Sequence, residues 1–337
     1  MNVGELAGVA AAVLSSALGG AAVGATRYVA GAIDPIALGA FRFGIGFCLL
    51  LPMALLGSSR ERWPARRDWP ATVALGLLFF GLFPLLFNAS LHYTSAARGA
   101  LSLSALPLLT MTVAGVLHVE PFTRRKTVGV LVAMTGVALS LLSDLRTAPP
   151  GAWRGDLLML AAALCMAFYS VGSRAVIRRS GPLSFTVMAM AAGALCLAGI
   201  AWHAGSFAPV ARFGMAQWLA VAYLGVFGGA IGFFLWAFAL GRTTPTRVAI
   251  SVTVNPVVAG LVGAWLLAEP LRWGLVVGLL AVLAGIVIAA SGGANVRVEG
   301  KRLDGLAVPM ATLCRGWPTS RLSVDRRACS RRWIHPH

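Results

Sequence analysis

A short polar pattern in an apolar segment is the best candidate in this chain for contact with a ligand. Arg247, Ser251 and Asn255 are spaced four residues apart, so they would share one face of a helix. An amide inside a membrane must find a partner or face water. Asn255 could therefore hydrogen-bond a substrate or another helix, and the sequence favours neither role. Ser251 indicates less, because a helical serine commonly bonds its own backbone.

The same pattern occurs earlier in the chain at one constant offset. An internal repeat fixes the architecture, and a duplicated unit inside a membrane is how many secondary transporters are built. Leu106 takes the place of Asn255, so the first copy lacks the amide. The matched pairs are Arg98 and Arg247, Ser102 and Ser251, Pro107 and Pro256, Glu120 and Glu269, and Pro121 and Pro270.

Pro107 and Pro256 lie near the middle of two matching apolar segments. A proline inside a helix removes one backbone hydrogen bond and clashes with the preceding turn, which kinks the helix. Interrupted helices at matching positions of two halves indicate a transporter binding site. A kink that serves packing alone is the alternative, since membrane helices tolerate proline, but the symmetry favours helices that line a pathway.

Three arginines could bind an anion. Arg42 lies about two turns into its apolar segment, too deep to reach the membrane surface easily, so it should face the bundle interior or a wet cavity. Arg98 and Arg247 begin their helices, where guanidinium and exposed amide groups together could attract a carboxylate or phosphate at each mouth of a pathway. Contact with lipid headgroups is the slightly favoured alternative. Weaker pathway candidates, each equally well explained by packing, are Asn88, Tyr169 and Trp236.

Composition indicates an integral membrane protein. The chain is 58% hydrophobic and 12% charged, against about 25% charged residues in soluble domains. All acidic residues lie at or beyond the ends of apolar segments, so no buried carboxylate is available as a proton relay. The histidines are terminal or near segment ends, and no Cys/His cluster exists. The sequence therefore predicts no catalytic residue, no metal site and no cofactor.

The net charge of +17 would suggest a nucleic-acid partner in a soluble protein. Here most of the basic residues lie on short loops and in the C-terminal tail, so no nucleic-acid partner is predicted. The loops on one side carry about twice as many Lys and Arg residues as those on the other. This bias predicts that both termini are cytoplasmic.

Apolar runs separated by polar residues predict ten transmembrane helices. Five helices in each copy is an odd number, so the second copy must enter the membrane from the opposite side. The expected fold class is an all-α integral membrane protein with ten transmembrane helices arranged as two inverted five-helix repeats. The segments are roughly 6–25, 36–56, 71–91, 97–118, 127–142, 157–177, 183–202, 216–240, 247–267 and 274–290.

The predicted first repeat occupies residues 1–146 and the second 147–296. Two prolines and a glycine interrupt the chain near residue 150, where the repeats join. Residues 297–337 form a basic tail without sustained periodicity. This composition predicts a disordered cytosolic segment that could touch anionic lipid.

Two five-helix units, each with a proline-containing fourth helix that ends in Glu-Pro, resemble the EamA repeat of the drug/metabolite transporter superfamily. The resemblance covers about residues 5–291. It implies a ten-helix permease with a central substrate cavity where the repeats meet. It also implies export of a small metabolite, such as an amino acid or related compound, across a bacterial cytoplasmic membrane. Further residues that carry it are Arg42-Phe43, Gly129, Gly136, Gly278 and Gly285.

Two alternatives come from other functional classes. A membrane-embedded enzyme would need convergent catalytic groups, which the sequence lacks. A non-transporting membrane assembly protein would be favoured if no cavity lay between the repeats.

Two packing features complete the expectations. Gly225 and Gly229, like Gly228 and Gly232, have the spacing that lets helices approach closely within one chain or between two, so a homodimer is compatible with the sequence. Glu120 closes its helix, where the helix dipole disfavours a carboxylate. A turn or a salt bridge to the basic residues that follow is expected to hold it.

Overall fold

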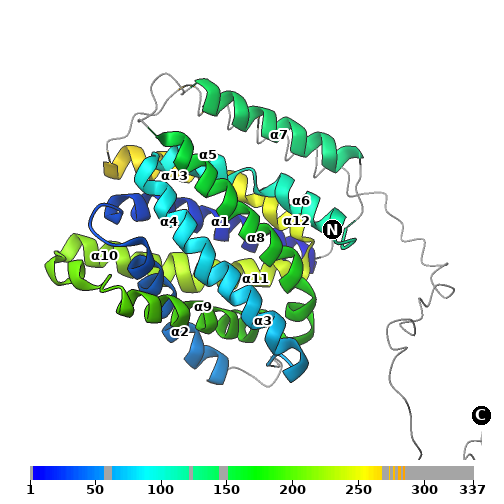
Figure 1. Ribbon diagram of the computed structural model, residues 1–337. Helices are drawn as coiled ribbons and strands as arrows, with labels where there is room; N and C mark the ends of the chain where they lie inside the picture. Colours follow the sequence, from blue (N-terminus) through cyan, green and yellow to red (C-terminus); the bar gives the residue numbers. More distant parts are fainter. Residues whose placement is uncertain are drawn as a thin grey trace, which may run out of the picture. The chain divides into compact units, whose positions relative to one another are not determined.

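The computed structural model describes residues 3–56, 63–120, 124–143 and 151–267, with a few single positions between 273 and 284 (Figure 1). These residues form helices joined by short loops, with no strand among them. The α-helices are α1 (Val3–Val29), α2 (Pro35–Leu56), α3 (Trp69–Gly76), α4 (Phe83–Tyr93), α5 (Ala96–Leu103), α6 (Leu106–Val116), α7 (Arg124–Ser143), α8 (Ala152–Ser180), α9 (Pro182–His203), α10 (Met215–Tyr223), α11 (Gly232–Arg242), α12 (Pro245–Ile250) and α13 (Asn255–Leu267). The short elements are the 3-10 helices η1 (Arg66–Asp68), η3 (Ala208–Arg212) and η5 (Ser251–Val254) and the π-helical η2 (Leu77–Leu82) and η4 (Leu224–Ile231).

Eight helical stretches are long and apolar enough to cross a membrane, judged by length and composition. Each lies within a few residues of a segment predicted from the sequence. The fifth predicted segment, 127–142, lies in α7, whose apolar part Thr127–Gly136 is shorter. The tenth, 274–290, and the tail 297–337 lie almost entirely outside the described residues, so the number ten stays a prediction. The eight are Val3–Val29, Pro35–Leu56, Arg66–Tyr93, Arg98–Val116, Ala152–Ser180, Pro182–His203, Met215–Arg242 and Pro245–Leu266.

The fourth and ninth segments are broken where a kink was expected. α5 ends at Leu103, and α6 begins at Leu106 with Pro107 in its first turn. Likewise α12 ends at Ile250, and η5 leads into α13 with Pro256 in its first turn. A proline there loses no intrahelical hydrogen bond, because the first amide groups of a helix have no partner. Each α-helix therefore restarts at its proline, so the predicted interruption is present and takes the form of a break in the regular α-helical hydrogen bonding.

The third and eighth segments each contain a π-helical stretch that the sequence did not predict. η2 lies between α3 and α4, and η4 lies between α10 and α11. A π turn widens the helix locally and is often found at functional sites. The two stretches occupy matching places in the two copies, so they belong to the repeated unit.

The second helix of each copy packs on the π segment of the other copy through glycine. A β-carbon added at Gly229 of η4 would lie 2.6 Å from the carbonyl oxygen of Arg42 in α2. One added at Gly193 of α9 would lie 2.5 Å from the carbonyl carbon of Phe80 in η2. Such close backbone contact requires residues without side chains. Gly229 and Gly225 thus make contacts within the chain.

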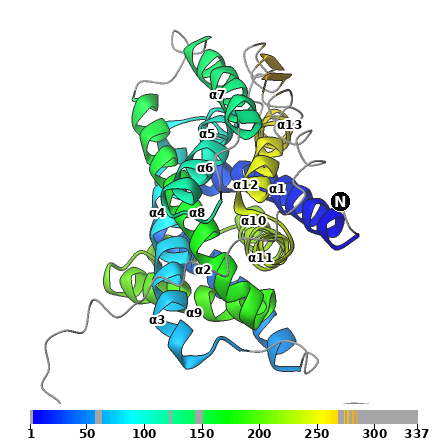
Figure 2. The ribbon, with the colours of Figure 1, turned by 90° about the vertical axis from the view of Figure 1, so that its right-hand side faces the viewer.

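Counterpart helices of the two copies pack in a reciprocal way. The first helix of each copy, α1 or α8, packs against the third and fourth segments of the other copy, which are α11 and α13 for α1 and α4 and α6 for α8. α5 packs on α13 and α6 packs on α12, so the two broken helices run antiparallel (Figures 1 and 2). This reciprocal pairing fits a layout of two repeats.

The contact between α2 and η4 makes a first prediction. Gly229→Ala should destabilise the purified protein by about 1–3 kcal/mol, because the new methyl group overlaps the α2 backbone. Gly44→Ala in α2 is the matched control, since its β-carbon would meet no atom within 4 Å. Unfolding in detergent micelles measures both. Equal stability of the two variants would contradict the close packing.

Candidate functional site

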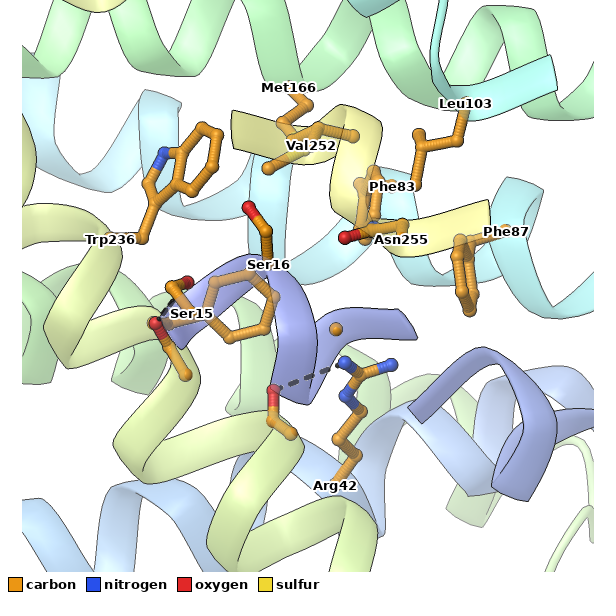
Figure 3. Close-up of a pocket in the computed structure, with 14 residues that line it drawn as sticks. Ser15, Ser16, Arg42, Phe83, Phe87, Leu103, Met166, Trp236, Val252 and Asn255 are labelled. Atoms are coloured by element: carbon orange, nitrogen blue, oxygen red, sulfur yellow. Dashed lines mark hydrogen bonds between the residues drawn. The ribbon is translucent and has the colours of Figure 1, made fainter. Parts of the chain in front are cut away.

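A small cavity lies among helices of both copies (Figure 3). About 40 Å³ of it is open to the centre of a water-sized sphere, which is room for a few water molecules. Leu103 at the end of α5 and Asn255 at the start of α13 both line it, so both broken helices border the space. The lining residues are Ser15, Ser16, Gly19, Arg42, Phe83, Phe87, Leu103, Met166, Gly228, Gly232, Phe233, Trp236, Val252 and Asn255.

Arg42 is the one charged side chain among the described residues that line the cavity. It is 4% exposed, and its Nη2 donates to the carbonyl oxygen of Gly228 at 3.1 Å. The guanidinium carbon lies 5.5, 5.8 and 5.6 Å from the ring centres of Phe43, Phe87 and Phe233, which is within cation–π range. Its Nε has no hydrogen-bond partner. The sequence predicted that Arg42 faces the interior or a cavity, and the structure places it there.

Asn255 faces the same space from α13 (Figure 3). It is 5% exposed, and its Oδ1 has no hydrogen-bond partner. A β-carbon on Gly19 of α1 would lie 3.4 Å from the Asn255 Nδ2, so the bare glycine leaves room beside the amide. The predicted alternative was a hydrogen bond between this amide and another helix, and among the described residues its Oδ1 accepts no such bond.

Two serines of α1 tie this helix to the second copy. Ser15 donates to the carbonyl oxygen of Gly232 at 2.7 Å, and the hydroxyls of Ser16 and Ser251 are 2.8 Å apart. Ser251 also lies within hydrogen-bond distance of the carbonyl oxygens of Ala12 and of its own helix. Ser251 is therefore engaged in packing and does not line the cavity, contrary to the expectation for this face of the helix.

Aromatic rings form much of the remaining wall. Phe83 and Phe87 of α4 stack with centroids 5.4 Å apart, and Phe233 and Trp236 come from α11. Trp236 turns its Nε1 outward from this wall to Ser170, at 3.3 Å. The cavity therefore combines one cation and one amide with an apolar surface.

Arg98 forms an ion pair inside the protein. Its Nη2 is 2.6 Å from Asp156 Oδ2, and the side chains of Arg98 and Asp156 are 6% and 16% exposed. Ser102 lies 3.1 Å from Asp156 Oδ1 and from the Arg98 carbonyl oxygen. Neither Arg98 nor Ser102 lines the cavity, so the expectation that Ser102 shares it with Asn255 is not met. Both side chains contact the Asp156 carboxylate of α8, which the sequence had not identified as their partner.

Arg247 makes the counterpart pair with Glu5. Glu5 lies in the first turn of α1 and Asp156 lies just after the first turn of α8, and these are the first helices of the two copies. Because α5–α6 and α12–α13 run antiparallel, the two pairs lie at opposite ends of these helices, and each joins one copy to the other. Both arginines thus have protein carboxylates as partners instead of the headgroups or free anions that were predicted.

The other predicted pathway residues do not line the cavity. Tyr169 is fully buried and stacks on Phe79 with centroids 4.1 Å apart. Asn88 donates to the carbonyl oxygen of Pro35 at 2.9 Å, which links α4 to α2. Pro107 and Pro256 are buried where their helices restart, and Pro256 directly follows the cavity-lining Asn255. These positions indicate packing roles.

Glu120 lies in a turn, as expected, and its carboxylate contacts the start of another helix. Its Oε1 accepts a hydrogen bond from the backbone N–H of Thr246, at 3.1 Å, in the first turn of α12. A carboxylate is favourable there, because the helix dipole and free amide groups are positive. Glu269 lies outside the described residues. Among the residues that are described, no group of three His, Cys, Asp or Glu side chains could hold a metal ion.

Sequence reasoning missed the serines of α1 and the two acidic partners. Ser15 and Ser16 carry no distinctive signal, because serine is common in membrane helices. Glu5 and Asp156 could have been found, since they begin counterpart helices just as Arg98 and Arg247 do. Aligning the first helices as well as the fourth would have shown two equivalent acid–base pairs.

The helices are long enough to cross a membrane, and the first helix of each copy packs against helices of the other copy. A partly polar cavity lies where the copies meet. This is the architecture of a membrane transporter. A model of the EamA-like transporter family matches the chain twice, over residues 6–142 and 153–291. The chain belongs to this family and is a multi-pass membrane protein.

Relatives and a solved structure agree with this assignment. PA1977 of Pseudomonas aeruginosa, named an uncharacterized protein, is 32% identical over 263 residues, which is 76% of this chain and 84% of that protein. The uncharacterized transporter YyaM of Bacillus subtilis is 24% identical over 275 residues, 80% and 89% of the two chains. A protein of Streptantibioticus cattleyicolor named "probable terminal-alkyne amino-acid exporter" is 27% identical over 248 residues, 72% and 78%. One crystal structure has a TM-score of 0.67 at 23% identity over 89% of this chain and 99% of its own, which shows the fold.

The difference in burial between the two ion pairs makes a second prediction. Asp156→Asn should destabilise the protein by about 3–5 kcal/mol, because it leaves the buried Arg98 cation without its carboxylate. Glu5→Gln is the matched variant at the more exposed pair, where Arg247 is 34% exposed, and it should cost about 1 kcal/mol or less. Unfolding of both variants in detergent measures the difference. A larger loss at Glu5 would contradict this ranking.

Proposed function

We propose that this protein is a secondary transporter that exports a small metabolite across the cytoplasmic membrane of a bacterium. The supporting observation is the cavity between the two copies, which both broken helices border. Helix ends at such a site expose backbone groups to a substrate where continuous helices would not. An assembly protein without a transport role would have no need of this cavity.

In the proposed cycle, ten helices form two inverted repeats that rock about the cavity. α7 and the segment 274–290 complete the two five-helix units. The Arg98–Asp156 and Arg247–Glu5 pairs each join the repeats at one end of the broken helices, so parting one pair would open one side of the cavity. The cavity has room for only a few water molecules, so a substrate would enter when the helices move apart.

The proposed substrate is an amino acid or a related compound. The cavity offers one cation, one amide and an apolar wall, which suits a small molecule with a polar end and an apolar end. The relative named as an amino-acid exporter supports both this class and the outward direction. The remaining proposed partners are membrane lipid and, through surfaces not used within the chain, a second copy.

A comparison of metabolites inside and outside cells tests the proposal. A strain that overproduces the protein should accumulate one compound or class in the medium, and a deletion strain should retain it. Mass spectrometry of both fractions measures the distribution. Identical distributions in the two strains, across rich and minimal media, would overturn export as the function.

Asn255→Leu should lower export by about tenfold or more, because the unpartnered amide is lost from the cavity. Leucine is the residue at the equivalent position 106, so the helix should tolerate it. Ser104→Ala is the control, since the Ser104 hydroxyl bonds its own helix at Ala100 and does not line the cavity. Normal export by Asn255→Leu, at equal amounts of protein in the membrane, would exclude this residue from the pathway.

The proposed topology places both termini in the cytoplasm. A reporter enzyme that is active only in the periplasm, fused after Arg297, should therefore be silent, because the bias of basic loops orients the chain. The same reporter placed after a cleaved signal peptide is the positive control. Strong activity of the Arg297 fusion would reverse the predicted orientation.

A further inference from the structure

Arg42 is a buried cation without a counter-ion. No carboxylate pairs with it among the described residues, and it is 4% exposed at a depth where water is scarce. This contrasts with Arg98 and Arg247, which both have acidic partners. A buried charge left without an opposite charge is costly to a folded protein, so its presence requires an explanation.

The contacts that Arg42 does make leave its charge uncompensated. One carbonyl oxygen, that of Gly228, accepts from Nη2, and three aromatic rings lie within 6 Å. Carbonyl dipoles and ring faces stabilise a guanidinium partly, and they also fix its orientation. The Nε has no partner, although a guanidinium offers five N–H groups in a rigid fork. This fork matches the two oxygens of a carboxylate.

The same cavity offers a complementary group beside Arg42. The Oδ1 of Asn255 is a buried acceptor without a partner, and the Ser16 hydroxyl lies on the same cavity. An ammonium group could donate to both. Phe83 and Trp236 line the same cavity and add apolar surface to it (Figure 3).

We propose that Arg42 binds the carboxylate of the transported molecule and that Asn255 accepts a hydrogen bond from its ammonium group. This inference rests on the proposed function and narrows its substrate class to zwitterionic α-amino acids with apolar side chains. A dianion such as a phosphate ester is disfavoured, because the described cavity lining supplies a single positive charge. A molecule without a carboxylate would leave Arg42 as unpaired as it is without ligand.

Ligand-induced thermal stabilisation of the purified protein tests this directly. The probes are leucine, valine, methionine and phenylalanine, each compared with its own carboxamide, which has the same side chain and ammonium group but no carboxylate charge. At least one acid should raise the melting temperature in a dose-dependent way, and its amide should need a concentration about 10- to 100-fold higher. If no acid stabilises the protein more than its amide, the proposal is wrong.

Variants of Arg42 test whether this residue causes the preference for the acid over its amide. Arg42→Gln should remove the difference between acid and amide, while the protein without ligand should be as stable as wild type or more stable, because a buried charge is gone. Arg42→Lys keeps the charge without the fork, so it should bind the acid more weakly than wild type and still prefer it to the amide. Arg179→Gln removes an equal charge from an exposed pair with Asp68 and should leave the preference intact.

The failure of this inference can be told from failure of the proposed function. An acid preference that persists in Arg42→Gln would refute the role of Arg42 and leave export untouched. Acid binding that depends on Arg42, in a protein that moves none of these probes out of loaded vesicles, would refute transport of this class and leave the binding site standing.

Discussion

The packing of α2 on the π segment η4 determines where the charge of the cavity lies. Gly229 brings the two backbones together at the level of Arg42, and Gly228 in the same segment accepts a hydrogen bond from the Arg42 side chain. With a larger residue at either glycine, the guanidinium would have to move from its present place. The depth, direction and partners of the single cation in the cavity therefore follow from a glycine contact between two helices of different copies.

The scarcity of water inside the membrane explains how the other polar residues are used. Arg98 and Asp156 are both costly alone at this depth, and together with Ser102 they satisfy one another. Asn88 donates a hydrogen bond to the carbonyl oxygen of Pro35 at the start of α2. Once these internal pairs are made, few buried polar atoms that face the cavity remain without partners. Those of Arg42 and Asn255 are the ones on which a ligand could act.

The sequence was sufficient for the helices and for part of the site. Apolar length and the repeated Arg–Ser–Pro pattern located the spans and the breaks near Pro107 and Pro256, because hydrocarbon tolerates few alternatives to a helix. Arg42 was found by its depth in the apolar segment, and Asn255 by its polarity and its spacing from Arg247 and Ser251. The side-chain directions of Ser102 and Ser251 were not, since each is set by a partner distant in sequence, Asp156 for Ser102 and Ser16 for Ser251. The π-helical segments η2 and η4 were not predicted from the sequence either, because they arise from contacts between helices distant in sequence.

The helical scaffold is symmetric between the two copies, whereas the cavity lining is not. The symmetry suits alternate opening to the two sides, and the asymmetry suits binding of a substrate in one orientation. Breaks, π segments, glycine contacts and Arg–acid pairs occur in both copies, as a transporter that opens to either side in turn would require. The counterpart of α2 is α9, which has no Lys or Arg, and the counterpart of Asn255 is Leu106. A second buried cation would double the cost of desolvation and attract a second anion. A single asymmetric pair, one cation from the first copy and one amide from the second, instead gives a bound zwitterion one orientation between two moving halves.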